Sequence, residues 1–100
     1  MDHPVSLLDQ VLDTLRAHQG DARARGLVLV GVVGSVARGE ARTDSDVDVV
    51  YDVIGRPTYF DIGAIAVALE DALDRPIDMV NRRAMKPDRW TYMGRDLVAA

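Results

Sequence analysis

The residues of this 100-residue chain whose types and spacing could do chemistry are two alternating aspartates, Asp46 and Asp48. Alternate side chains of a strand share a face, so the two carboxylates would project together, roughly 6.6 Å apart along the strand at ~3.3 Å per residue. Ionised carboxylates this close repel one another, and a divalent cation between them relieves the repulsion. The pair therefore predicts metal-bound phosphate chemistry, whereas the alternative is a pair of solvated turn residues.

A glycine turn lies ten residues before the aspartates, where Gly34 and Ser35 directly follow an apolar run. Gly34 can adopt backbone angles closed to other residues and lets a phosphate approach the main chain. Ser35 adds a hydroxyl and an N–H group, and a helix that begins there would favour an anion through its free N–H groups. We expect Gly34 and Ser35 to bind a phosphate group.

A third carboxylate, Asp78, stands inside a short apolar segment. Acidic side chains rarely face a core without a partner. If this segment pairs beside the strand that carries Asp46 and Asp48, Asp78 completes a cluster of three carboxylates. It would then bind a metal ion or accept a proton, and the sequence does not separate these two roles.

Two further charged residues near the aspartates carry weaker signals. Arg38 is a candidate phosphate partner, and the alternative is a salt bridge to Glu40 or Asp44. Asp52 shares the parity of Asp46 and Asp48 but lies some 13 Å beyond Asp46 at ~3.3 Å per residue, so we do not expect it to be a ligand.

The composition limits the kind of ion and partner. There is no cysteine and there are two histidines, so oxygen ligands and a hard cation, Mg²⁺ or Mn²⁺, are favoured. The net charge of −4 disfavours direct binding of nucleic acid, although four arginines form a local exception: Arg23, Arg25, Arg38 and Arg42. The chain carries neither an apolar run long enough to span a membrane nor the pattern of a signal peptide, so we expect no membrane association and a cytoplasmic location.

The apolar pattern supplies the elements that must position these residues. Short Val- and Leu-rich runs predict buried strands over residues 27–33, 47–54 and 77–80. Helical spacing predicts a first helix that includes Val5 and stops at Gly20, a second over residues 58–74, and a short last one from Pro87 in which Leu97 and Val98 are apolar positions. The expected fold is α/β (α+β), a small mixed sheet flanked by helices in a single domain of residues 1–100.

The spacing Gly34-Ser35, ten residues, then Asp46-Val47-Asp48 resembles the Gly-Ser-x10-Asp-x-Asp signature of the polymerase-β-like nucleotidyltransferase superfamily. The surrounding residues are similar to its minimal nucleotidyltransferase (MNT) branch in particular, and the similarity covers about residues 27–80. The resemblance implies the polymerase-β-like nucleotidyltransferase fold with a short helix from Ser35, and a reaction that uses Mg²⁺ and a nucleoside triphosphate, usually ATP.

The same resemblance implies a biological role. Many MNT proteins are antitoxins that accompany a HEPN-type RNase toxin, and some silence it by transferring AMP to a toxin tyrosine. We therefore expect two-metal nucleotidyl transfer in which Asp46, Asp48 and Asp78 hold the metal ions, with the chain in a hetero-oligomer with its toxin.

Two other functions remain open. The chain could neutralise a HEPN-type partner by binding alone, through an apolar patch in its last segment, although a helix that closes the domain's own core explains the same residues: Trp90, Tyr92, Met93, Leu97 and Val98. Transfer to a small molecule would require a second domain or a dimer to enclose the acceptor.

Overall fold

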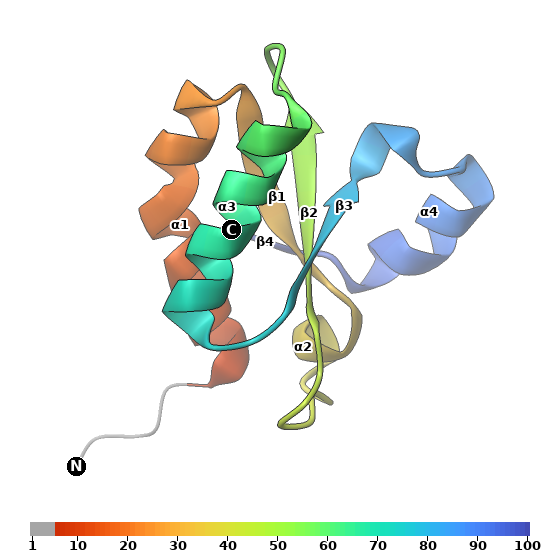
Figure 1. The fold of residues 1–100 in the computed structure, drawn as a ribbon. Helices are drawn as coiled ribbons and strands as arrows, with labels where there is room; N and C mark the ends of the chain where they lie inside the picture. Colours follow the sequence, from red (N-terminus) through yellow and green to blue (C-terminus); the bar gives the residue numbers. More distant parts are fainter. Residues whose placement is uncertain (1–5) are drawn as a thin grey trace.

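The computed structural model describes residues 6–100 (Figure 1). Its main elements are α1 (Leu7–Ala24), β1 (Leu27–Val33), α2 (Gly34–Arg38), β2 (Val47–Val53), α3 (Tyr59–Leu73), β3 (Ile77–Asn81), α4 (Pro87–Met93) and β4 (Val98–Ala99). Two short 3₁₀ helices, Arg82–Ala84 and Gly94–Asp96, flank α4. Val5 lies outside the described residues. The strand over residues 27–33 was predicted correctly, and the other two predicted strands differ from the observed ones by one residue at the end.

The four strands form one mixed sheet in the order β3-β2-β1-β4. β1 pairs antiparallel with both β2 and β4, whereas β2 and β3 run parallel. The parallel pairing requires a crossover connection, and α3 supplies it. The expected mixed sheet flanked by helices is confirmed.

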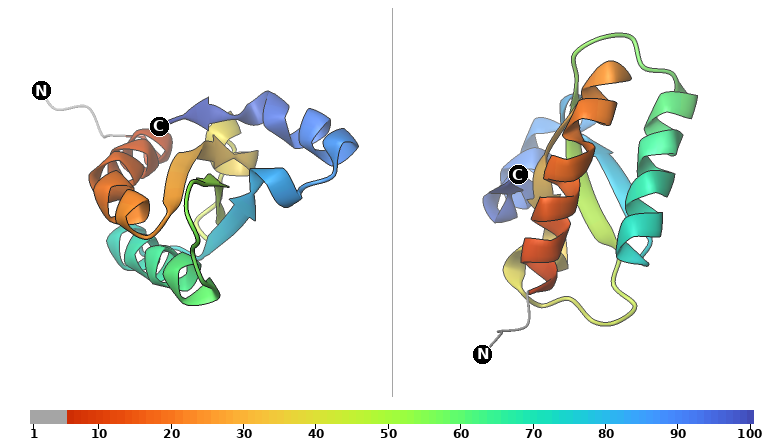
Figure 2. Two further views of the ribbon diagram at one scale, coloured as in Figure 1. Left: turned by 90° about the horizontal axis from the view of Figure 1, so that it is seen from above. Right: turned by 90° about the vertical axis from the view of Figure 1, so that its left-hand side faces the viewer.

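Helices α1 and α3 lie side by side on one face of the sheet, while α4 stands on the other side (Figures 1 and 2). Strand alternation gives β2 two different faces. Val47, Val49 and Tyr51 are buried in the core beneath the helices, and Asp48 and Asp52 point the other way. The face beneath the helices is therefore apolar, whereas the other face carries the two carboxylates, with the buried Val50 between them.

The first helix does not stop at Gly20 as predicted but continues to Ala24. Gly20 lies on an exposed helix surface, where glycine costs only about 1 kcal/mol relative to alanine. The helix ends instead before Gly26, whose φ of +89° suits glycine and whose N–H donates to the carbonyl of Arg23. At the other end Ser6 caps the helix, since its side chain accepts a hydrogen bond from the N–H of Asp9.

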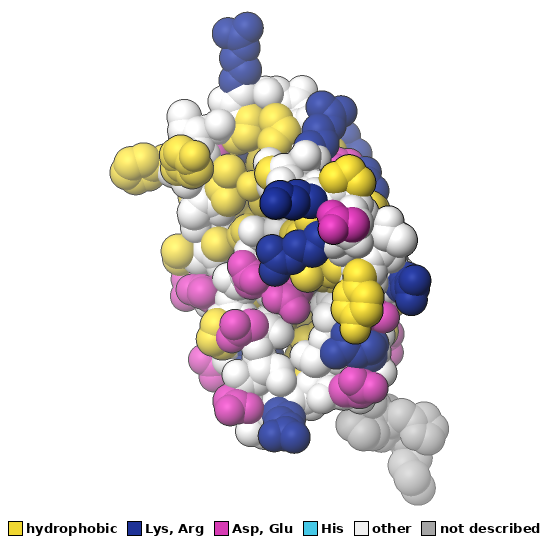
Figure 3. Space-filling view, turned by 90° about the vertical axis from the view of Figure 1, so that its right-hand side faces the viewer, with side chains coloured by type: hydrophobic (Ala, Val, Ile, Leu, Met, Phe, Trp, Pro, Cys, Tyr) yellow, Lys and Arg dark blue, Asp and Glu magenta, His cyan; other side chains and the backbone are white. Residues whose placement is uncertain are grey.

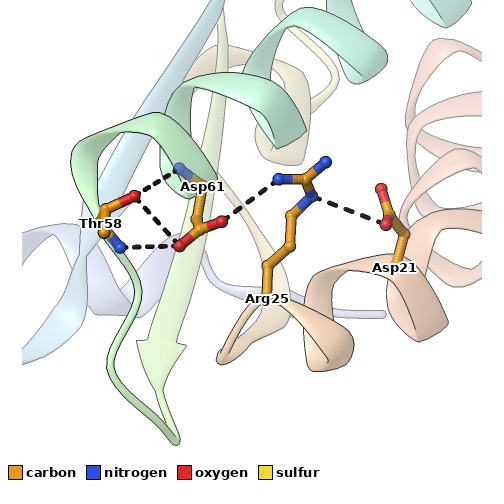
Figure 4. A network of polar contacts seen from close by, with 4 residues as sticks. All are labelled: Asp21, Arg25, Thr58 and Asp61. Carbon is orange, nitrogen blue, oxygen red and sulfur yellow. Dashed lines mark hydrogen bonds and ion pairs between the residues drawn. The ribbon is translucent and has the colours of Figure 1, made fainter.

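Polar contacts fix α3 against α1 (Figure 4). Thr58 and Asp61 form a reciprocal capping box at the start of α3. Arg25, after the end of α1, donates to Asp61 at 3.2 Å and lies 3.6 Å from Asp21. The backbone N–H of Thr58, with help from Arg25, holds the pKa of Asp61 below its usual value. These contacts link α1 to α3 at the end of the sheet where β1 begins.

The end of the chain corrects the sequence-based expectation. The last helix ends at Met93, and Val98 belongs to β4 instead of a helix. Gly31 of β1 permits this pairing, because a Cβ atom there would overlap the carbonyl oxygen of Val98. Of the last segment's apolar residues only Val98 packs against the core, and α4 has no buried residue, so this helix does not close the domain's core.

Within residues 6–100, no helix is both long enough and apolar enough to cross a membrane.

Candidate functional site

Strand register brings the second and third predicted aspartates together. β2 and β3 run parallel with Asp48 directly opposite Asp78. Both side chains lie on the open face of the sheet, because their neighbours Val47, Val49 and Met79 face the helices. The condition on which the role of Asp78 depended, pairing of its segment beside β2, is met.

Gly34 closes the other side of the Asp48 carboxylate. Val33, the residue before it, is the β1 partner of Asp48, so the chain turns into α2 directly beside this side chain. Gly34 has a φ of +78°, and a Cβ atom there would overlap Oδ2 of Asp48. A glycine is required for two reasons: the left-handed backbone and the close approach of a carboxylate.

The surroundings of Asp48 disfavour the ionised form of its carboxylate. Partial burial raises the pKa of Asp48, and the negative charges of Asp78 and Asp46 raise it further. Asp46 lies in the loop just before β2, and both Asp46 and Asp78 are exposed. Figure 3 shows acidic side chains gathered on this side of the molecule, directly beside basic ones. The site therefore holds excess negative charge that a cation would neutralise.

The donor set fits a hard divalent cation. Its groups are carboxylate oxygens, with no cysteine or histidine among them, which is the set that Mg²⁺ and Mn²⁺ prefer. In the part of the chain that the structure describes, no three His, Asp or Glu side chains converge closely enough to hold a metal ion as they stand. The fit therefore rests on the Asp48–Asp78 pair and on the charge of Asp46 near it.

The predicted phosphate-binding residues begin the short helix α2. The helix starts at Gly34, one residue before the expected start, and no side chain caps its first N–H groups. Ser35 is half-buried beside Gly34. Main-chain N–H groups and a hydroxyl thus lie next to the Asp48 carboxylate, where a phosphate could bridge them and a cation.

Arg38 is held in the salt bridge that was the alternative to phosphate binding. Its Nε donates to Glu40 at 3.0 Å and its Nη1 to Asp96 at 2.8 Å. These contacts raise the pKa of Arg38 above its usual value, the Glu40 contact most. Sequence reasoning named Glu40 but missed Asp96, because no local pattern connects residues 58 positions apart.

Asp52 is engaged elsewhere, which agrees with its exclusion as a ligand. Both its carboxylate oxygens accept hydrogen bonds from Arg82, one of them at 3.0 Å from Nε. The pair joins β2 to the 3₁₀ helix after β3. The Arg82 contact was not foreseen, since the pairing of β2 with β3 creates it.

Comparisons with known proteins give consistent results. The nucleotidyltransferase domain family matches residues 8–93. Protein adenylyltransferase MntA of Thermococcus cleftensis is 35% identical over 80 residues, which are 79% of this chain and 81% of that protein. A solved structure described as a minimal nucleotidyltransferase is 35% identical, with a TM-score of 0.70 over 89% of this chain and 95% of its own.

A second solved structure, a toxin–antitoxin with AMP-PNP, shares the fold at 20% identity. Its TM-score is 0.60, and the match covers 85% of this chain and 67% of that one.

We expect Gly34→Ala to impair the site beyond its effect on stability. Gly39 supplies a matched control, because it has a similar φ of +74° but a Cβ atom there meets nothing within 4 Å. Both substitutions should lower the free energy of unfolding by roughly 1–2 kcal/mol, the cost of a left-handed backbone. If Mg²⁺ with ATP binds the folded state, it should raise the melting temperature, and only Gly34→Ala should abolish this rise. A full rise in Gly34→Ala would contradict the role given to this contact.

We expect Asp48→Asn to stabilise the metal-free protein at neutral pH. The folded-state pKa of Asp48 is raised, so the folded protein binds this proton more tightly than the unfolded chain does. Stability is therefore lost as pH rises from the ordinary carboxyl pKa, about 3.9, through the folded value. The variant lacks this loss.

Urea unfolding with a chelator present checks the effect. Asp48→Asn should have a higher free energy of unfolding than the wild type at pH 7. This difference should vanish as the pH is lowered to the ordinary carboxyl pKa, about 3.9. Asp52→Asn, which removes a carboxylate paired with Arg82, should be neutral or destabilising by about 0–1 kcal/mol. A variant at position 48 that is less stable at pH 7 would argue against carboxylate repulsion.

Proposed function

The chain belongs to the nucleotidyltransferase domain family and is a nucleotidyltransferase, and from this premise we propose that it transfers AMP from ATP to a tyrosine of a HEPN-type RNase toxin. It would thereby act as an antitoxin, with residues 1–100 as a single minimal nucleotidyltransferase domain. The name of the relative MntA, a protein adenylyltransferase, supports a protein as acceptor. The toxin–antitoxin with AMP-PNP that shares this fold supports a toxin partner and an adenine nucleotide.

The observation that carries the proposal is the register of β2 with β3. It places Asp48 opposite Asp78 on the open face of the sheet, with Gly34 directly against the Asp48 carboxylate. Carboxylates beside free main-chain N–H groups are what a triphosphate with its cation requires. We propose Asp46, Asp48 and Asp78 as the Mg²⁺ ligands and Gly34 and Ser35 as the phosphate-binding residues.

The reaction assigns a task to each group. Mg²⁺, when bound by the aspartates, would neutralise charge on the triphosphate and on the attacking oxygen. Gly34 and Ser35 would hold the terminal phosphates through N–H groups and the hydroxyl. The tyrosine oxygen attacks the α-phosphorus in line, a new P–O bond forms, and the bond to the β-phosphate oxygen breaks so that pyrophosphate leaves.

The proton of the acceptor hydroxyl needs a base. Asp78 is the candidate, because it lies opposite Asp48 in the sheet and its side chain is exposed on the open face. Its other role, as a ligand of the second metal ion, is compatible with the same position. In either role it would act on the acceptor side of the site.

The open face of the sheet favours a protein as acceptor. Asp46 and Asp78 are exposed, and α1 and α3 both lie on the opposite face. The helix α4 stands on this side but is short and has no buried residue, so a small acceptor would find few walls to bind it. A protein acceptor brings its own surface to the site.

A second candidate function is neutralisation by binding alone, and the position of α4 favours it. This helix has no buried residue, and Tyr92 is 77% exposed. An aromatic side chain on a helix that serves no core is suited to contact a partner. The same contact would also serve an enzyme that must hold its toxin during transfer.

Intact-mass spectrometry tests the proposal. A HEPN-type toxin encoded beside this chain is incubated with it, ATP and Mg²⁺, and its mass should increase by whole AMP units. Asp48→Asn and a chelator should each abolish the increase, whereas Asp52→Asn, on the same face of β2, should retain it. Peptide mapping should place the AMP on tyrosine.

Two outcomes would contradict transfer as proposed. An undiminished increase with Asp48→Asn would exclude the assigned site. No increase, together with a tight complex that survives the double change Asp46→Ala and Asp48→Ala, would establish neutralisation by binding.

A further inference from the structure

The outer face of α3 exposes large apolar side chains that the nucleotidyl-transfer site does not use. Tyr59 is 94% exposed, Phe60 90% and Val67 55%. Phe60, Gly63 and Val67 follow the spacing of one helical stripe, while Ile65 and Leu69 are buried against the sheet. We define the α3 patch as Tyr59, Phe60, Gly63, Ala64 and Val67, which together line a shallow hollow.

The α3 patch lies away from the catalytic face. Helix α3 covers the side of the sheet opposite to the one that carries Asp48 and Asp78, and α4 stands across the sheet from it (Figure 2). A molecule bound to the patch would leave the open face free. The patch therefore calls for an occupant other than the nucleotide or the acceptor tyrosine.

The two ends of the α3 patch carry opposite charges. Arg56 lies just before the helix, and Asp71 continues the stripe one turn beyond Val67. Both side chains are exposed. Among the ion pairs within residues 6–100, neither Arg56 nor Asp71 takes part. A partner that complements this surface must be apolar in the middle, acidic at one end and basic at the other.

We propose that the α3 patch binds the α3 patch of a second copy of this chain, with the two helices antiparallel about a two-fold axis. The axis passes between Gly63 and Ala64. Phe60 then lies opposite Val67 of the second copy, because both are three positions from these central residues. Arg56, in the loop before the helix, belongs to the end of the patch that meets the end carrying Asp71 in the second copy, and the symmetry repeats every contact.

The centre of the α3 patch allows this approach. A Cβ atom at Gly63 would meet nothing within 4 Å, so the space above the helix is free. Small residues at a crossing point let two helices pack at the short end of the usual interaxial distance, about 8 Å. The aromatic residues flank the crossing and would close over it from both sides.

The size of the patch predicts a weak dimer. Four aromatic side chains, two from each copy, would bury about 600–1,000 Å² if fully covered. Stable interfaces bury about 1,200–2,000 Å² in total. The dimer should therefore form in a concentration-dependent manner, with each copy presenting its catalytic face outward to one toxin.

Sedimentation velocity of the full chain, without a toxin, tests the dimer from low micromolar to millimolar concentration. The wild type should shift from monomer to dimer across this range. Phe60→Ser should raise the dissociation constant by at least about tenfold, since a central aromatic residue usually dominates such an interface. Tyr92→Ser, an exposed aromatic residue on α4, is the matched control and should change nothing.

Charge reversal tests the antiparallel arrangement itself. Arg56→Asp and Asp71→Arg should each weaken the dimer, because each places like charges opposite one another twice. The double variant should restore the wild-type dissociation constant. Far-UV circular dichroism confirms folding in each case, as these side chains do not belong to the core.

Three results would overturn the proposal. One is a wild type that stays monomeric at all concentrations, which would leave a heterologous partner as the occupant of the patch. Another is a dimer that Phe60→Ser leaves intact, which would place the interface elsewhere. The third is a pair of weakening charge reversals without rescue in the double variant, which would exclude the antiparallel register.

Discussion

The crowding of negative charge around Asp48 is the constraint on which the rest of this structure depends. Its carboxylate is half-buried, faces Asp78 across two paired strands, and lies directly against Gly34. Partial burial and the negative charges of Asp78 and Asp46 raise the pKa of Asp48 and so disfavour its ionised form. An asparagine would remove this repulsion, and a bound cation would neutralise it. We propose that the fold keeps this charge for a cationic ligand.

The sheet positions the site by separating its two faces. β2 directs Val47 and Val49 toward the helices and Asp48 toward the open side. The parallel crossover through α3 then sets β3 beside β2, which brings Asp78 to Asp48 from 30 residues along the chain. Both long helices lie on the opposite face, where the Arg25–Asp61 contact links them. The open face is left to Asp48, Asp78 and the start of α2.

The sequence predicted correctly those features that depend on residues close to one another along the chain. The strand of residues 27–33 was recognisable because a seven-residue run with six Val or Leu residues stands between two glycines, and the Asp46–Asp48 pair was recognisable by spacing alone. Long-range pairings were not recognisable. The contacts of Asp96 with Arg38 and of Arg82 with Asp52 depend on tertiary packing, and β4 is a two-residue strand that exists only because Gly31 admits it. Asp78 could be predicted only conditionally. Its proposed role requires that β3 pair beside β2, which the sequence allowed but did not specify.

The measurement that tests the central claim most directly is a carbon-13 NMR titration of the aspartate carboxyl groups. In the metal-free protein Asp48 should titrate above the ordinary carboxyl range. Mg²⁺ with a non-hydrolysable ATP analogue should then shift the signals of Asp46, Asp48 and Asp78 and bring the titration of Asp48 to lower pH, with Asp52 unaffected. An ordinary pKa for Asp48, or a ligand-induced shift confined to other residues, would contradict the account.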